Sequence, residues 1–327
     1  MGLGWMLHQT LAGTVKLGDL LLCFQAFQQC QILLRALLEG AGKIYRSLLF
    51  VENLDDFLKV ESALLSGQAG ELGLPVKDSI RFERISFTYP GGSYRALDEF
   101  DLEIPKGKVI ALVGHNGAGK STLIKLMCRF YDPDEGRILL DGVDLRSLDQ
   151  EALRRRIAVL FQDPVHYHAS VRENIAFGDI EGLGDQARVW EAARNAGALE
   201  PIERLEGGFE AILGKWFGGA ELSGGEWQRI ALARAFFRQA SLVILDEPTS
   251  SMDSWAEQDW LGRFRALTAG KTALMITHRF TTAMHADVIH VLDKGRVLES
   301  GTHKELVARG GAYASSWAAQ MQEIGKV

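Results

Sequence analysis

The sequence predicts an α/β fold with a mostly parallel sheet, preceded by an α-helical segment of the transmembrane type. Three observations support this prediction. From residue 80 onward, short apolar runs of strand length alternate with helical stretches, the pattern of strands joined by crossover helices. A glycine-rich loop directly follows one of these runs. Residues 20–38 form an apolar segment about as long as a bilayer-spanning helix.

Composition places the chain among folded proteins and excludes some functions. Its 327 residues leave room for one full domain and a smaller segment. The 47% hydrophobic and 24% charged residues argue against wholesale disorder. A net charge of -6 argues against a nucleic-acid partner, because phosphate binding usually leaves a basic surface. Cys23, Cys30 and Cys128 have no metal-ligand spacing, and we expect them to be small buried residues in a reducing compartment.

The N-terminal segment combines apolar length with polar interruptions. Residues 20–38 are rich in leucine and phenylalanine, and helical spacing continues through residues 44–57. Polar groups at membrane depth are costly unless they face a bundle interior or an aqueous cavity, so the pattern suits a pore-lining helix. An amphipathic helix on a soluble partner or on a membrane surface is the alternative, and composition alone leaves both open. The polar interruptions are Gln25, Gln28, Gln29, Gln31 and Arg35.

A change in composition marks the domain boundary. Residues 66–75 are rich in small and turn-forming residues, which predicts a linker. We therefore expect a helical part over residues 1–66, a linker over 67–79 and an α/β domain over 80–327. The first residues lack a basic stretch before the apolar core, so we do not expect a secretory signal.

Within the α/β domain, strands and helices are expected in alternation. Helices are predicted at residues 121–130, 186–198 and 227–237 from their spacing. The apolar runs predict strands at residues 80–87, 96–104, 109–113, 157–161, 242–245, 272–276 and 288–292.

The strand at 109–113 leads directly into a phosphate-binding motif. Residues 114–122 read Gly-His-Asn-Gly-Ala-Gly-Lys-Ser-Thr and match G-x-x-x-x-G-K-[ST] in its strand-to-helix setting. Glycines let the backbone N–H groups approach phosphates, and the helix start favours negative charge. We expect Lys120 to reach the β- and γ-phosphates of ATP and Ser121 to bind Mg²⁺. A glycine-rich turn that contains lysine by chance fits this setting poorly. The predicted nucleotide-binding residues are Gly114, Asn116, Gly117, Ala118, Gly119, Lys120, Ser121 and Thr122.

Two adjacent acids end the apolar run at 242–245. Burying Asp246 and Glu247 without a cation would be expensive, so both are expected at a site. With a phosphate loop upstream, Asp246 is the expected Mg²⁺ partner, directly or through water. Glu247 is placed to deprotonate or orient the attacking water. A plain surface turn after a strand is the alternative for Glu247.

A third motif gives the resemblance to a known family. Residues 222–226 read Leu-Ser-Gly-Gly-Glu at the start of a predicted helix, which resembles the LSGGQ signature of ATP-binding cassette (ABC) proteins. The resemblance implies that Ser223, Gly224 and Gly225 form a second anion site. In the family this site serves the ATP of a partner cassette, so that two cassettes enclose two nucleotides head to tail.

Further residues match the family in order along the chain. Tyr89 resembles the aromatic residue that stacks on adenine, although packing on its strand is the alternative. Gln162 resembles the glutamine that senses Mg²⁺ and contacts the membrane domain, and His278 resembles the histidine that touches the γ-phosphate. Glu247, His278 and Gln162 are thus the expected catalytic residues, with Ser121, Gln162 and Asp246 at the metal. Residues 248–253 match the loop that crosses to the other cassette, with Ser-Met where the family more often has Ala-Leu.

The ends of the chain resemble the exporter branch of the family. Gly-Thr-His at 301–303 fits that branch, and residues 13–20 resemble the outer loop before the last exporter helix. Residues 213–220 lack the usual acidic and Gly-Glu-Arg-Gly stretch, which puts the contact between cassette and membrane domain in doubt. An exporter half normally supplies six spanning helices. The sequence is therefore expected to be a fragment, an expressed piece or a truncated gene product.

Together these observations predict ATP binding and hydrolysis that power export of an unknown substrate. The expected cofactors are ATP and Mg²⁺, and the expected partners are a second half-transporter, identical or different, a membrane domain and membrane lipid. The cassette is expected on the cytoplasmic side of the cell membrane. The alternatives are a soluble ABC ATPase that does not transport, or a truncated product that binds ATP without pumping. Soluble members carry coiled-coil insertions or tandem cassettes with a basic surface, which this sequence lacks.

Overall fold

A computed structural model describes residues 5, 8, 11–12, 16–59, 64, 67, 79–214, 218–248 and 254–324. The chain divides into two compact units, Met1–Ala63 and Leu64–Val327, and each is described by itself. Most of the expected linker at 67–79 lies outside the described residues.

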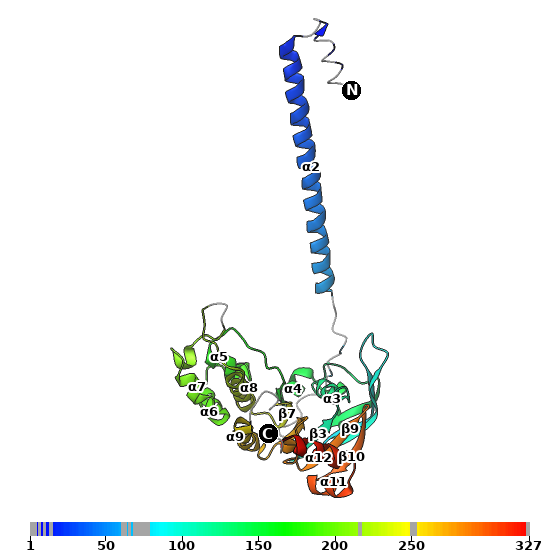
Figure 1. Cartoon of the computed structure of the whole chain (residues 1–327), viewed down its shortest axis with the longest axis vertical. Coiled ribbons are helices and arrows are strands. Elements are labelled where there is room, and N and C mark those ends of the chain that lie inside the picture. The colour runs from blue at the N-terminus through cyan, green and yellow to red at the C-terminus, as the bar shows by residue number, and fades with distance from the viewer. Residues whose placement is uncertain are drawn as a thin grey trace. The chain divides into compact units, whose positions relative to one another are not determined.

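The first unit is dominated by one long helix, α2 (Leu17–Leu58) (Figure 1). Its 42 residues contain no proline and many good helix formers, so the backbone ladder runs without interruption. Large apolar side chains along it are exposed, among them Leu37 at 67% and Phe50 at 70%. By length and composition alone the helix could cross a membrane. The expectation of buried cysteines is wrong for Cys23 and Cys30, which are exposed on α2, and holds for Cys128.

The second unit contains a four-stranded antiparallel sheet in the order β2-β1-β4-β5. Its inner face packs apolar side chains such as Phe82 and Phe100, whose rings meet edge to face at 5.9 Å. The strands are β1 (Ser79–Thr88), β2 (Arg95–Pro105), β4 (Glu135–Leu140) and β5 (Val143–Asp144).

A six-stranded sheet in the order β10-β9-β3-β8-β7-β6 forms the centre of the unit. All neighbouring pairs are parallel except β9 and β10. Alternate residues of β3 enter two cores: Ala111 and Val113 belong to one, and Ile110 and Leu112 to the other. Burial on both faces explains why these strands are continuous apolar runs. The strands are β3 (Val109–Gly114), β6 (Ile157–Leu160), β7 (Leu242–Asp246), β8 (Thr272–Ile276), β9 (Val288–Asp293) and β10 (Arg296–Gly301).

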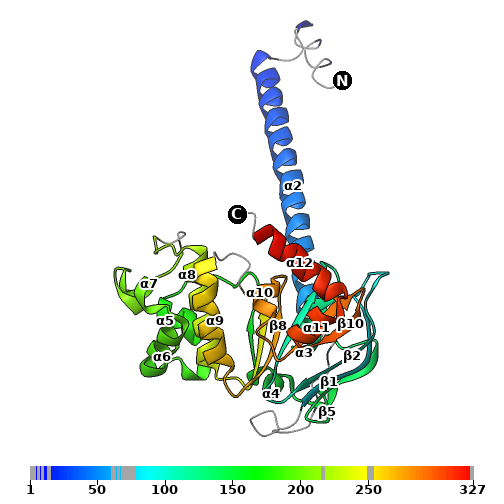
Figure 2. The same cartoon turned by 60° about the horizontal axis from the view of Figure 1, so that its bottom comes forward.

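Helices cover the central sheet and form a separate group beside it (Figures 1 and 2). In that group α5 (Val171–Ala176) and α6 (Gln186–Ala196) pack on α8 (Gly224–Arg238), with α7 (Leu199–Glu203) alongside. The other helices are α3 (Lys120–Met127), α4 (Gln150–Arg155), α9 (Ser254–Thr268), α10 (Phe280–Ala283), α11 (His303–Arg309) and α12 (Ala312–Ile324).

The architecture confirms the predicted α/β class with a helical and an antiparallel β subdomain. Every strand predicted from an apolar run is present within one or two residues at each end. The helix expected to reach residue 130 ends at Met127. Cys128 is its C-cap residue, and Arg129 has a left-handed backbone with φ 47°, which cannot continue the helix. The sequence did not predict strands β4, β5 and β10, the helices α4, α5, α7, α9 and α10, or the C-terminal helices α11 and α12.

Candidate functional site

The candidate site begins at the loop between β3 and α3. Gly119 sits at the N-cap of α3 with φ +101°, and a Cβ there would lie 2.7 Å from the carbonyl oxygen of Ala96. Only glycine fits such a left-handed, crowded position. Within the loop, the Ala118 N–H donates to the His115 carbonyl at 3.2 Å. The loop is therefore a tight backbone turn that leads into a helix start, the form of a phosphate cradle.

Lys120 is the first residue of α3 and turns back into this loop. Its side chain is largely buried, and Nζ donates to the carbonyl oxygens of Gly114 at 2.7 Å and His115 at 2.9 Å. Burial lowers the pKa of Lys120, while the charges of Glu247 and Asp246 oppose that shift. The Lys120 ammonium group therefore lies at the N-terminus of α3. The positive charge and the helix N-terminus both favour binding of an anion.

Asp246 lies at the carboxyl end of β7 and is also buried. Burial raises its pKa and the neighbouring charge of Glu247 adds to this, whereas Lys120 and a hydrogen bond from Ser121 lower it. The structure therefore brings together the carboxylate and hydroxyl that the sequence assigned to Mg²⁺. Oxygen ligands of this kind, few in number and beside a phosphate site, fit a magnesium ion.

Glu247 follows in a conformation that is rare for its residue type. Its φ is +47°, and its N–H donates to the Ile276 carbonyl at the end of β8 at 2.9 Å. A left-handed non-glycine residue costs on the order of 1–3 kcal/mol and is typical of functional sites. This turn points the carboxylate at the next loop, where Oε1 lies 2.8 Å from Nε2 of His278.

His278 completes this cluster from the loop that follows β8. Burial lowers the pKa of His278 and the charge of Lys120 lowers it further, while Glu247 opposes the shift. A neutral imidazole donates its Nε2–H to the Glu247 carboxylate. Lys120, Asp246 and the Glu247–His278 pair thus meet at the carboxyl ends of β3, β8 and β7, which are adjacent strands.

Tyr89 follows β1 and contacts the first turn of α3. Its hydroxyl is 3.1 Å from Oγ1 of Thr122. Its ring meets Phe87 edge to face at 5.0 Å and Tyr131 at 5.5 Å, and Nζ of Lys125 lies 4.9 Å from the ring centre. Tyr89 therefore does take part in packing near its strand, and it also stands beside a residue of the phosphate motif.

Ser223 is the N-cap of α8 and belongs to a capping box. The carboxylate of Glu226 accepts from the Ser223 N–H at 2.8 Å and from its hydroxyl at 2.9 Å, and also accepts from Arg204 at 2.8 Å. Ser223, Gly224 and Gly225 are exposed. Next in the helix, Trp227 stacks on His166 with ring centres 4.1 Å apart. The helix start is thus rigid and open to solvent.

Two predicted site residues stand apart from the cluster. Gln162 is exposed in the loop after β6, and Ser223 is exposed at α8. Among the described residues, no hydrogen bond or ion pair joins either one to Lys120, Asp246, Glu247 or His278. The crossing loop expected at residues 248–253 lies outside the described residues after position 248, and so do residues 215–217 of the departure before the signature.

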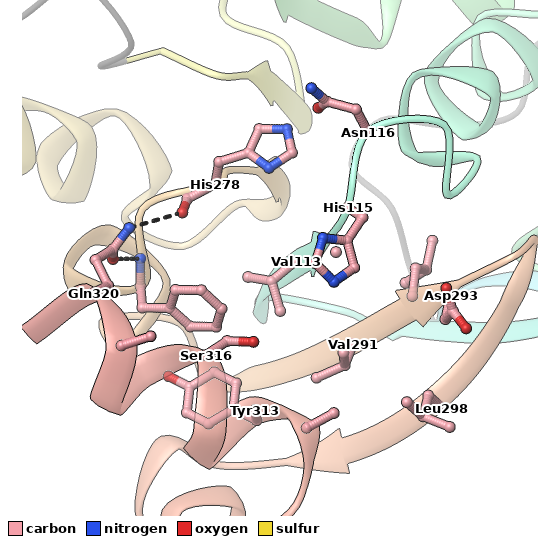
Figure 3. A pocket seen from close by; sticks show the side chains of 15 residues that line it. Val113, His115, Asn116, His278, Val291, Asp293, Leu298, Tyr313, Ser316 and Gln320 are labelled. Atoms are coloured by element: carbon pink, nitrogen blue, oxygen red, sulfur yellow. Dashed lines mark hydrogen bonds between the residues drawn. The ribbon is translucent and has the colours of Figure 1, made fainter.

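Sequence reasoning missed a cavity of about 590 Å³ beside the phosphate loop. His115 and His278 line it together with residues of β9, β10 and α12 (Figure 3). One polar residue of α12, Gln320, bonds to the backbone of the His278 loop. The only sequence signal was a glutamine among the apolar residues near the C-terminus, which no motif singled out.

A phosphate cradle after β3, two acids at the end of β7 and a second, glycine-rich helix start define an ATPase of the cassette class. Comparison with known proteins agrees. The family model described as "ABC transporter" matches residues 97–250. The chain therefore contains an ATP-hydrolysing cassette of the ABC transporter type.

Individual relatives cover almost the whole chain. The ATP-dependent lipid A-core flippase of Hahella chejuensis is 36% identical over 98% of this chain and 54% of the relative. The subtilin transport ATP-binding protein SpaT of Bacillus subtilis is 36% identical over 90% of this chain and 48% of its own length. A bacterial Atm1-family ABC exporter with ATP bound has a TM-score of 0.75 and 32% identity, covering 94% of this chain and 53% of that one. The chain thus spans about half the length of the curated relatives it matches.

Proposed function

We propose that this chain binds ATP with Mg²⁺ and uses its hydrolysis to drive export of a substrate across a membrane. The observation that supports this most strongly is the meeting of Lys120, Asp246 and the Glu247–His278 pair at the ends of three adjacent strands. The buried Lys120 cation, the oxygen atoms of Ser121 and Asp246 and the Glu247 carboxylate lie beside a phosphate-binding loop. This arrangement is suited to phosphoryl transfer to water.

Each residue then has a distinct task. Backbone N–H groups of the loop from Gly114 to Gly119, with Thr122 and Lys120, bind and orient the triphosphate. Ser121 and Asp246 would hold Mg²⁺, with Gln162 of the loop after β6 as a further ligand. When bound, the metal neutralises charge that develops on the phosphoryl oxygens.

Glu247 and His278 act on the attacking water. The Glu247 carboxylate accepts a proton from that water as general base. His278 donates from Nε2 at 2.8 Å, which fixes the direction of the carboxylate. His278 lines the same cavity as residues of the phosphate loop, and its proposed task there is to contact the terminal phosphate. Tyr89 supplies an aromatic face for adenine beside Thr122.

The exposed signature serves a second cassette. Ser223, Gly224 and Gly225 are outside the cluster of their own chain and free to meet the nucleotide of a partner, identical or different. We further propose that residues 1–66 are the end of a membrane domain in contact with lipid, 67–79 the linker and 80–327 the cassette on the cytoplasmic side. The relatives named as a lipid flippase and a subtilin transporter make lipid and peptide the first substrates to test.

The test is Mg²⁺-dependent ATPase activity of the purified chain as a function of protein concentration. Glu247→Gln should keep ATP binding and lower turnover by about 10²–10⁴, because the general base is lost. The variant should also accumulate an ATP-bound dimer, measured by light scattering. Glu200→Gln, an exposed change on α7, is the matched control and should behave as wild type. Wild-type turnover in Glu247→Gln would rule out the general-base assignment.

A further inference from the structure

The C-terminal helix α12 is anchored firmly at its first turn. The carboxylate of Glu299 on β10 accepts from the N–H groups of Ala312 at 2.6 Å and Tyr313 at 3.2 Å. Tyr313 is fully buried, and its hydroxyl lies 2.8 Å from Nδ1 of His303 on α11. Bonds at the helix start and a buried ring just inside it fix the position of α12 on the central sheet.

About two turns further along, α12 reaches the loop that carries His278 (Figure 3). The side-chain amide of Gln320 makes two hydrogen bonds there: Oε1 accepts from the Phe280 N–H at 2.7 Å, and Nε2 donates to the His278 carbonyl at 3.2 Å. The two bonds lie on either side of Arg279. The Phe280 ring packs against Tyr313 with centres 5.2 Å apart. A single side chain thus brackets the backbone that carries the imidazole.

Residues 277–279 lie between the end of β8 and the start of α10. At the two ends of this segment, the Thr277 N–H donates to the Leu112 carbonyl of β3 at 3.2 Å, and the Arg279 carbonyl accepts from the N–H groups of Thr282 and Ala283. The bracket matters because it holds the residue between these two, His278. Thr277 supplies one local bond, accepting the Arg279 N–H at 3.0 Å. Gln320 supplies the link to a distant, anchored element. It also borders the cavity into which His115 of the phosphate loop projects.

We propose that Gln320 is a positioning residue for hydrolysis: through α12 it holds the His278 loop so that the imidazole stays within reach of Glu247. This inference rests on the proposed function of His278 and Glu247. Because the bonds are to backbone atoms, Gln320 sets the placement of the imidazole and leaves nucleotide binding to the loop around Lys120. A displacement of about 1 Å in a catalytic group can lower a rate by up to roughly 100-fold.

The experiment compares Gln320→Leu with Gln322→Leu, the same change at an exposed position of the same helix. Gln320→Leu should lower kcat for ATP about tenfold or more while KM changes by less than about twofold, the signature of a lost transition-state arrangement. Gln320→Glu keeps an acceptor for Phe280 but no donor for His278, and should give an intermediate kcat. Gln322→Leu should match wild type.

Hydrogen exchange by mass spectrometry provides a readout apart from activity. In Gln320→Leu, peptides over residues 277–284 should exchange faster, while peptides over 312–318, held by Glu299 and Tyr313, should not. Unchanged exchange at 277–284, or faster exchange through all of α12 with kcat and KM changed together, would overturn the proposal. Glu247→Gln in the same series distinguishes the proposed ATPase function from the positioning role of Gln320. If only Glu247→Gln loses turnover, the ATPase function stands and the Gln320 inference fails.

Discussion

Tyr89 shows how a single residue can belong both to the core and to a ligand site. Its ring completes an aromatic group with Phe87 and Tyr131, and its hydroxyl meets Thr122 of the phosphate motif. Nζ of Lys125 lies 4.9 Å from the ring centre. The packing alternative and the adenine alternative are therefore compatible, because a ring has two faces and stacking on a nucleobase needs only one of them.

Substitutions of Tyr89 separate base recognition from phosphate binding. Tyr89→Ala should weaken ATP binding by about 1–3 kcal/mol, the usual range for base stacking on an aromatic ring. Tyr89→Phe keeps the ring and should bind nearly as well as wild type. Isothermal titration with ATP and with inorganic tripolyphosphate makes the comparison. If Tyr89→Ala weakens tripolyphosphate as much as ATP, the residue acts on the loop fold and not on adenine.

The sequence could predict those site residues whose neighbours in the chain define their chemistry. Lys120 begins a helix and Asp246 ends a buried strand, each within a local sequence motif. The structure places the two residues close together. Two features depend on contacts that no local pattern encodes. The left-handed backbone of Glu247 is held by the Ile276 carbonyl of another strand. Gln320 and His278 are 42 residues apart and meet only after α12 docks.

At the level of elements, burial decides which strands could be predicted. β3, β7 and β8 are covered on both faces, and their apolar runs identify them without ambiguity. β4 begins with three exposed residues, so its apolar run is only three residues long, and β10 has no buried residue at all. β10 nevertheless supports the site, because it carries Glu299, the anchor of α12.

The pairing of β9 with β10 predicts a pH dependence of stability. His290 of β9 lies 2.7 Å from the Ser300 hydroxyl, and burial lowers the pKa of His290 to about 4. Below an ordinary pKa of about 6.5 the unfolded chain binds a proton there and the folded chain does not, so stability falls as pH decreases from about 6.5 to 4. Between pH 7 and pH 5 this amounts to about 2 kcal/mol, at about 1.4 kcal/mol per pKa unit.

Urea unfolding of wild type and His290→Gln at pH 7 and pH 5 measures this contribution. Glutamine can still bond to Ser300 but does not titrate, so the variant should lose about 2 kcal/mol less than wild type on acidification. The other acids and histidines are the same in both chains and cancel in the difference. Equal losses in the two chains would show that His290 is not the group responsible.

For the whole molecule, the two units differ in what surrounds their apolar residues. The cassette buries its large apolar side chains in two cores on either side of the central sheet. α2 instead exposes Leu33, Leu37 and Phe50 at 60%, 67% and 70%. So much exposed apolar surface on one helix requires lipid or protein around it. The sequence predicted the helix but left its surroundings open.

Fractionation of a fusion between residues 1–67 and a soluble reporter tests the membrane assignment. We expect the fusion in the membrane fraction, resistant to alkaline wash, and the reporter alone in the soluble fraction. Leu33→Arg with Leu37→Arg should shift the fusion toward the soluble fraction, since each arginine at a helix centre costs about 2.5–3.5 kcal/mol on insertion. Gln25→Arg with Gln28→Arg, on the polar side of the helix, adds the same charge and should shift it less. A fully soluble wild-type fusion would favour an amphipathic helix on a soluble partner. It would also contradict the export function proposed for the cassette.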